Sequence, residues 1–140
     1  MTGTATIALI RAYYDAFNAG DPAGMLDLVT EDLEHHVNEG PVRRGRAAFA
    51  DFCAHMGVSY RERLEDLVVF ATPDGTRAAA EFTVHGEYLR TDPGLPEARG
   101  QRYVLPAGAF FSLRAGRIAR ITTYYNLSDW IRQVSDGDPR

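Results

Sequence analysis

The chain has 140 residues, a formal net charge of −4 and 15 basic residues, all of which are arginine. Because lysine is absent, the composition excludes the Schiff-base lysine of aldolases and pyridoxal phosphate enzymes and the lysine of a P-loop. The single cysteine, Cys53, excludes an intramolecular disulfide and a zinc site built on several cysteines. The acidic net charge argues against a nucleic-acid partner.

The length predicts one domain, residues 1–140, with an ordered core over about residues 5–134. No stretch reaches 18 uninterrupted apolar residues, so we expect no membrane partner. The first residues lack a basic segment followed by an apolar one, which argues against a signal peptide and for a cytoplasmic location. A polar tail, Ser135–Arg140, is expected to fray.

The first part of the chain predicts three helices and one strand. Apolar residues recur at helical spacing from Ile7 to Phe17, and the helix is expected to end at Asn18-Ala19-Gly20. Asp21 caps a short second helix that begins at Pro22. Residues 33–38 alternate as in a strand, which places His35 on the apolar face with Leu33 and Val37. A third helix over 47–56 is expected to bury its apolar residues, Phe49, Phe52, Cys53 and Met56.

The second part predicts strands over 64–72, 77–89, 101–113 and 117–125, and then a short helix that contains Trp130. Alternation places Val84, Gly86 and Tyr88 on the inner face of the sheet. The same reasoning predicts that Gly108, Phe110 and Tyr125 face inward and that Tyr103 and Tyr124 face outward. The connection over 90–100 is longer than a hairpin needs, and three interpretations are open: a solvated loop, a lid or a loop that reaches across a dimer.

Helices that are segregated from strands predict an α+β fold, in which a cone-shaped, curved antiparallel sheet packs against three N-terminal helices. Two glycines on the expected inner face predict a bent sheet with open volume between its walls. The wall residues are apolar or aromatic, which favours a hydrophobic small-molecule ligand held by a few polar groups.

Two regions of the sequence resemble a known family. The first region is Tyr13–Asp21, which reads YYDAFNAGD, and the second is Val104–Phe111, which reads VLPAGAFF. Both resemble the SnoaL-like and ketosteroid isomerase-related proteins of the nuclear-transport-factor-2-like superfamily, and the resemblance extends over about residues 5–134. It implies a cone-shaped, cystatin-like fold and cofactor-free proton transfer on a hydrophobic carbonyl compound, such as a steroid or a polyketide. Shorter matches support it: Met25-Leu26, Glu31-Asp32, Gly116-Arg117-Ile118 and Tyr124-Tyr125-Asn126.

The resemblance also implies positions for the catalytic groups of ketosteroid isomerases, whose site contains an aspartate base and an oxyanion hole made of a tyrosine and a protonated aspartic acid. The tyrosine matches Tyr13. The base falls on Val37 and the oxyanion-hole acid on Gly108, and neither residue carries a proton that could be transferred. The usual machinery is therefore incomplete in this chain.

His35 is the residue of the apolar strand face that could take over proton transfer, because an ordinary histidine titrates near neutral pH. We predict that His35 acts as base or acid and that Tyr13 donates a hydrogen bond to the developing oxyanion. The alternative is that both residues are buried for structural reasons. No metal ligands and no cofactor are expected. The residues expected to bind the ligand are Val37, Phe52, Val84, Tyr88, Gly108, Phe110, Tyr125 and Asn126.

Three functions remain open. The first is an isomerase or cyclase of the kind described, and the second is a non-catalytic protein that binds a hydrophobic small molecule in the same pocket. The third, an epoxide hydrolase, needs an inward-facing set of aspartate, arginine and aspartate that the predicted strand faces do not provide. A homodimer is expected in each case, since the predicted outer sheet face mixes polar and aromatic residues: Thr83, His85, Tyr103, Thr122 and Tyr124.

Overall fold

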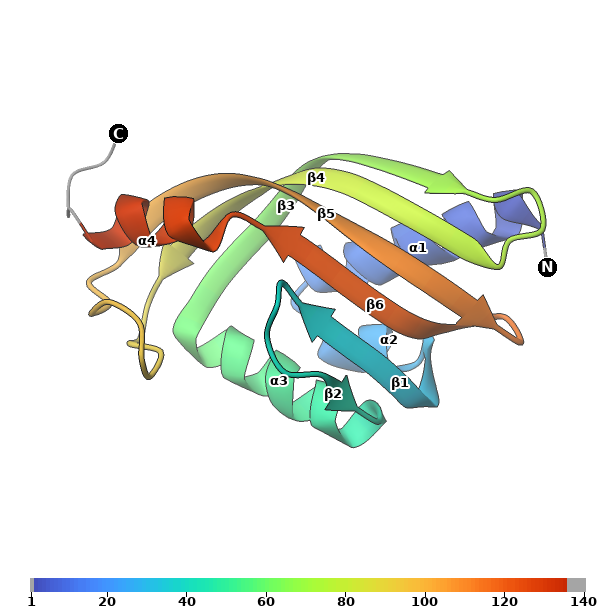
Figure 1. Cartoon of the computed structure of the whole chain (residues 1–140), viewed down its shortest axis with the longest axis horizontal. Helices are drawn as coiled ribbons and strands as arrows, with labels where there is room; N and C mark the ends of the chain where they lie inside the picture. Colours follow the sequence, from blue (N-terminus) through green and yellow to red (C-terminus); the bar gives the residue numbers. More distant parts are fainter. Residues whose placement is uncertain (1, 136–140) are drawn as a thin grey trace.

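The computed structural model of the chain describes residues 2–135. Residues 136–140 of the predicted polar tail lie outside the described residues. Residues 2–135 form four helices and six strands, in an order close to the predicted one, and Figure 1 shows their arrangement. The elements are α1 (Gly3–Asn18), α2 (Pro22–Leu26), β1 (Val29–Val37), β2 (Arg43–Arg44), α3 (Arg46–Ser59), β3 (Tyr60–Ala71), β4 (Arg77–Tyr88), β5 (Gln101–Arg114), β6 (Arg117–Tyr125) and α4 (Leu127–Ser135).

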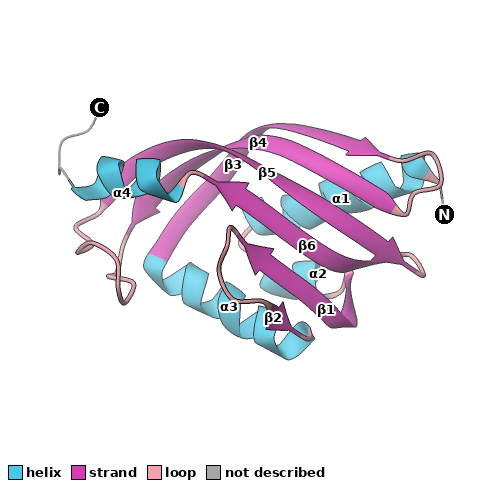
Figure 2. Ribbon diagram, viewed as in Figure 1, coloured by secondary structure: helices cyan, strands magenta, loops and turns pink. Residues whose placement is uncertain are grey.

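The strands form one curved sheet in the order β2-β1-β6-β5-β4-β3. The sheet curves around α1, α2 and α3, so that the apolar faces of the helices and of the strands meet in one core (Figure 2). The α+β fold is therefore confirmed. The expectation of a purely antiparallel sheet is wrong for one pair, because β1 and β6 run parallel. None of the helices within residues 2–135 has the length and hydropathy needed to cross a membrane.

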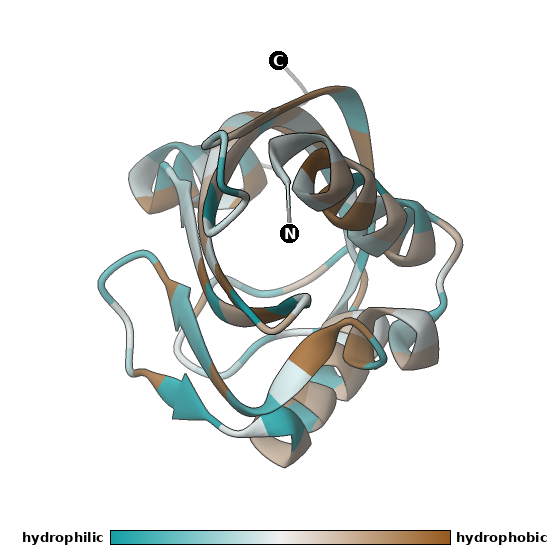
Figure 3. Ribbon diagram, turned by 90° about the vertical axis from the view of Figure 1, so that its right-hand side faces the viewer, coloured by the Kyte–Doolittle hydropathy of each residue, from teal (hydrophilic) through white to brown (hydrophobic). Residues whose placement is uncertain are grey.

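Helix α2 begins where the sequence predicts, and α1 begins at Gly3, four residues before the predicted apolar pattern. The Thr2 side chain caps α1 by accepting a hydrogen bond from the Ala5 amide at 3.1 Å, and Asp21 caps α2 by accepting one from the Gly24 amide at 3.1 Å. Helix α1 buries Ile10, Tyr13 and Tyr14 against the sheet. Figure 3, which looks at the molecule from the end where the N-terminus lies, shows the strands curving around this interior.

The predicted inner face of β4 is confirmed, since Phe82, Val84 and Tyr88 are buried. The predicted faces of β5 are wrong. Gly86 pairs with Tyr103 and Glu81 pairs with Gly108, so Tyr103 faces inward and Gly108 faces outward. Phe110 is 51% exposed on the outer face, while its neighbour Phe111 is fully buried. Tyr124 is 49% exposed beside Phe110, so its predicted outward position is confirmed.

Where β3 and β5 have no adjoining strand, side-chain amides form hydrogen bonds with backbone N–H and C=O groups that would otherwise lack a partner. Strand β3 is the last in the sheet, and Asn18 bonds both to the Leu64 carbonyl at 3.0 Å and to the Leu64 amide at 2.9 Å. Strand β6 pairs with β5 no further than Ala107. Beyond that point, Gln133 of α4 bonds both to the Val104 amide and to the Val104 carbonyl. Each amide thus imitates one residue of an adjoining strand.

Candidate functional site

His35 lies on the interior side of β1, as predicted, and is 4% exposed. Its ring packs against two phenylalanines of α3, with centroid separations of 4.8 Å to Phe49 and 4.6 Å to Phe52. Among the described residues, no group hydrogen-bonds its buried Nδ1 atom. A buried polar atom without a partner is uncommon in folded proteins, and a ligand is one group that would satisfy it.

The surroundings of His35 change its expected chemistry. Burial, together with the nearby charges of Arg43 and His36, lowers the pKa of His35 to about 4. The expectation that this histidine titrates near neutral pH is therefore wrong. At pH 7 the imidazole is uncharged, and its N–H group can donate a hydrogen bond while its other nitrogen can accept one.

Tyr13 lies on the core side of α1 and is 4% exposed. Its ring makes edge contacts with Tyr14 at 5.1 Å and with Phe111 at 6.2 Å between centroids. Burial raises the pKa of Tyr13 well above its ordinary value, and Tyr14 and Cys53 add to this shift. The hydroxyl group therefore stays protonated and can act as a hydrogen-bond donor.

A second group of aromatic residues lies where α4 meets the sheet. Trp130 of α4 is 3% exposed and packs edge-on against Tyr88 at 4.9 Å and against Tyr103 at 5.9 Å between centroids. Tyr60 stacks on Tyr88 at 5.4 Å. Tyr88, which we predicted to bind the ligand, donates a hydrogen bond from its hydroxyl group to the Pro96 carbonyl at 2.7 Å. The Tyr88 hydroxyl therefore supports the 90–100 connection.

Asp92 attaches this connection to the rest of the domain. Its carboxylate accepts a hydrogen bond from the Tyr60 hydroxyl at 2.7 Å and lies 3.1 Å from Nε2 of His55 on α3. Its backbone amide donates to the Tyr88 hydroxyl at 2.9 Å. The loop predicted over 90–100 is confirmed, and α3, β3 and β4 together hold it in place.

The remaining predicted ligand residues fall into three sets: interior residues, one exposed residue and two residues of the outer sheet face. Val84 is buried, and Val37, Phe52 and Tyr125 are half-buried on the interior side. Asn126 is exposed, and its side chain accepts a hydrogen bond from the Asp129 amide at the start of α4. The prediction that Gly108 and Phe110 line the interior is wrong, since both lie on the outer face of β5.

Glu62 on β3 is a polar group of the interior that sequence reasoning missed. It pairs across the sheet with Gly86, and Gly86 pairs with Tyr103, so the three residues form one row on the same face. The Tyr103 hydroxyl donates to the Glu62 carboxylate at 2.5 Å. Burial raises the pKa of Glu62, although the bond from Tyr103 opposes the shift. The alternation of Tyr60, Glu62 and Leu64 with the exposed Arg61 and Arg63 could have revealed this residue.

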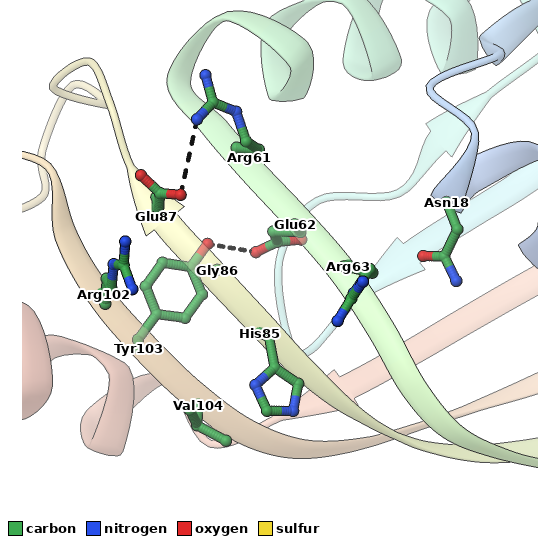
Figure 4. A pocket seen from close by; sticks show the side chains of 10 residues that line it. All are labelled: Asn18, Arg61, Glu62, Arg63, His85, Gly86, Glu87, Arg102, Tyr103 and Val104. Carbon is green, nitrogen blue, oxygen red and sulfur yellow. Dashed lines mark hydrogen bonds and ion pairs between the residues drawn. The ribbon is translucent and has the colours of Figure 1, made fainter.

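Glu62, Gly86 and Tyr103 are also among the residues that line a hollow of about 530 Å³, which Figure 4 shows. The figure also shows the bond from Tyr103 to Glu62 and the ion pair between Arg61 and Glu87. A second hollow, of about 460 Å³, is lined by Asp32, Glu34, Arg44 and Gly45. His35 and Tyr13 line neither of these two hollows.

The comparisons with known proteins agree with this fold. A family model described as a SnoaL-like domain matches residues 10–121. A solved structure of a proposed polyketide cyclase from a Silicibacter species is 62% identical, with a TM-score of 0.92 over 96% of this chain and 98% of that one. Among curated proteins, none matches the chain.

More distant structures share the fold alone. A nuclear-transport-factor-2-like protein of Burkholderia xenovorans is 17% identical, with a TM-score of 0.76 over 96% of this chain and 98% of that one. An epoxide hydrolase-like protein of M. tuberculosis is also 17% identical, with a TM-score of 0.71 over 96% and 92%. The curved sheet, the helices in its concavity and the match over residues 10–121 lead to one conclusion: the chain belongs to the SnoaL-like domain family, with the nuclear-transport-factor-2-like fold.

Proposed function

We propose that the protein catalyses cofactor-free proton transfer on a hydrophobic carbonyl compound, in an isomerisation or a ring closure. The observation that carries this proposal is the buried Nδ1 atom of His35, which has no partner among the described residues and belongs to a ring packed against two phenylalanine rings. An apolar setting with a free hydrogen-bonding group suits a ligand that is mostly hydrocarbon and carries a carbonyl oxygen.

In the proposed reaction, Nδ1 of His35 takes a proton from the carbon next to the carbonyl group, so a C–H bond breaks, an N–H bond forms and negative charge develops on the carbonyl oxygen. The imidazole then returns the proton to the same carbon or to a conjugated one. The protonated hydroxyl of Tyr13 is suited to stabilise that charge, because a donor in an apolar site acts more strongly than a donor in water. The remaining interior residues, Val37, Phe52, Val84, Tyr88 and Tyr125, would contact the hydrocarbon part, with Asn126 near its outer end.

Solvent exchange tests the proposal without knowledge of the natural product. The protein is incubated in D₂O with a panel of polycyclic ketones, and deuterium uptake next to the carbonyl group is followed by NMR. We expect His35→Ala and Tyr13→Phe each to lower the exchange rate by about 100-fold, the lower limit for loss of a general base and of an oxyanion donor respectively. Tyr14→Phe is the matched control, since Tyr14 is buried to the same extent on the same helix. Exchange by the wild-type protein no faster than the buffer rate refutes the proposal.

The second candidate function is ligand binding without catalysis. The lowered pKa of His35 favours it, because a histidine that titrates near pH 4 is a weak base at neutral pH. In that case the same ketones would raise the melting temperature of the protein without any deuterium uptake, and His35→Ala would reduce the increase.

We also propose that the protein acts in the cytoplasm as a homodimer that pairs through the outer sheet face. Five large apolar side chains are exposed on β3, β5 and β6: Val68, Phe70, Val104, Phe110 and Tyr124. Light scattering at micromolar concentration is expected to give twice the mass of the chain, and Phe110→Glu is expected to give the monomer mass. A monomeric wild-type protein would contradict the dimer.

A further inference from the structure

Arg43 is a cationic side chain on the same side of the sheet as His35. Strands β1 and β2 pair antiparallel, and Arg43 lies directly opposite His35 in this pair. Side chains of directly opposed residues project from the same face of a sheet. Because His35 faces the interior, the half-buried Arg43 lies on the interior side as well, at the edge of the sheet that β2 forms. Figure 1 shows β2 next to β1 and α3.

Phe52 of α3 contacts both side chains. The guanidinium carbon of Arg43 lies 4.4 Å from the centre of the Phe52 ring, and the centre of the His35 ring lies 4.6 Å from the same point. The two groups are therefore separated by no more than these two distances taken together. A guanidinium group over an aromatic face is held by the attraction between its positive charge and the π electrons. Phe52 thus holds a positive charge close to the imidazole whose Nδ1 atom has no partner within residues 2–135.

The guanidinium group of Arg43 has no hydrogen-bond acceptor and no anionic partner in the part of the chain that the structure describes. The next two arginines are both paired, Arg44 with Glu34 at 2.7 Å and Arg46 with Glu31 at 2.6 Å. A guanidinium group has N–H donors in a planar fork that matches the two oxygens of a carboxylate. Arg43 therefore presents a positioned anion-binding group whose anion the described residues do not supply.

We infer that Arg43 binds a carboxylate of the substrate while His35 acts on the carbon next to its carbonyl group, so that the substrate is a hydrophobic keto acid. This inference deepens the proposed function and rests on it. A carboxylate fits better than a phosphate monoester, because it carries a single charge that one guanidinium group neutralises. Since Arg43 and His35 contact one phenyl ring, the carboxylate lies close to the carbon that loses the proton and fixes its position at the base.

The bound carboxylate also makes His35 a stronger base. The positive charge of Arg43 is one cause that lowers the pKa of His35, after burial and ahead of His36. An anion on Arg43 offsets that charge, so the pKa of His35 rises in the complex towards neutral pH. The other side chains against His35 are apolar and carry no charge that opposes this change: Phe49 and Phe52 of α3 and Ile121 of β6.

The test compares two probes that differ mainly in charge. One is a tetralone with a carboxylate on the ring carbon next to its exchangeable CH₂ group, and the other is the methyl ester of the same compound. Calorimetry measures the dissociation constants, and NMR measures deuterium uptake. We expect the wild-type protein to bind the carboxylate about 10- to 100-fold more tightly than the ester, the range for hydrogen bonds to a charged group. Arg43→Gln is expected to remove this preference while its affinity for the ester stays at the wild-type value.

The imidazole of His35 provides a second measurement. Titration of its C–H signals by NMR is expected to give a higher pKa in the carboxylate complex than in the ester complex. In Arg43→Gln this difference between the two complexes should be absent. A role of Arg43 in packing alone would produce neither result.

Controls and alternative outcomes separate this inference from the proposed function. Arg44→Gln is the matched control, because Arg44 is the adjacent residue of β2 but pairs with Glu34 on the other face, and it should keep the preference for the carboxylate. Thermal unfolding checks that Arg43→Gln is folded, and Arg43→Met, which keeps an apolar contact with Phe52, replaces it if it is not. Equal affinities of the wild-type protein for the two probes would overturn the carboxylate site alone, as would an equal loss of affinity for both in Arg43→Gln. Absence of deuterium uptake by both probes would overturn the proposed function, even if binding favours the carboxylate.

Discussion

Replacing Gly86 with valine is expected to lower the free energy of unfolding by about 3 kcal/mol or more. The new side chain would occupy the space of the Tyr103 ring, which is 2% exposed and packed against Trp130. The ring would have to leave the core, and its bond to Glu62 would break. Urea unfolding monitored by circular dichroism measures the loss.

Two further variants show whether the Tyr103 ring is the cause. Tyr103→Ala combined with Gly86→Val should destabilise by less than the sum of the single changes, because the first removes the obstacle to the second. Gly57→Ala is the matched control, since no atom lies within 4 Å of its added Cβ atom in α3. That variant is expected to gain about 0.5–1 kcal/mol. Additive losses at positions 86 and 103 would refute the explanation.

Acidification is expected to destabilise the protein through His35. Its pKa is about 4 in the folded state against 6.5 as the ordinary value, so between these values the unfolded chain binds more protons than the folded one. The stability contributed by the neutral imidazole is complete above about pH 6.5 and is lost as the pH falls towards 4. The total loss is about 3 kcal/mol, from 1.36 kcal/mol per pKa unit.

The variant His35→Leu isolates this contribution. It removes the titrating group and the unpartnered nitrogen together, so its stability is expected to change less between pH 6.5 and pH 4 than that of the wild type. The comparison is made by urea unfolding at several pH values. Both proteins have the same carboxylates, so the contributions of these groups cancel in the difference between the two free energies of unfolding. His36→Leu, on the other face of β1, keeps His35 and removes only the smallest of the three causes that lower its pKa, so it should retain most of the wild-type loss. Parallel stability curves for the wild type and His35→Leu would contradict the assignment.

The sequence predicted the element order and the faces of β4 because its residues alternate between apolar and polar side chains. The faces of β5 could not be predicted in the same way. Val104 and Leu105 are adjacent apolar residues, as are Phe110 and Phe111, so alternation gives no single answer. The register with β4 decides it, because only Gly86 leaves room for the ring of Tyr103. That contact joins residues 17 positions apart in the sequence and is visible only in three dimensions.

The candidate site could be predicted only in part, because contacts between separate elements of the fold decide the rest. The inner position of His35 followed from its two apolar neighbours on β1, Leu33 and Val37. The pKa of His35 did not, because it depends on burial beneath Phe49 and Phe52 of a separate helix. Glu62 was missed because it stands between two arginines, a pattern typical of a solvent-exposed strand. Only the pairing of three strands shows that its side chain meets the hydroxyl of Tyr103.

The hydrogen bonds from the Asn18 and Gln133 side-chain amides to strand backbones limit how copies of the chain can aggregate. A strand with free backbone groups is a template on which another chain can add a strand, and the exposed Val68 and Phe70 would make β3 attractive for this. Asn18 occupies the Leu64 backbone groups, and the irregular pairing between Glu65 and Val68, where Asp66 has a positive φ, interrupts the strand further on. Gln133 closes the free stretch of β5. Fibril-like growth from these edges is therefore obstructed, while the broad face of the sheet stays open for the proposed contact between copies.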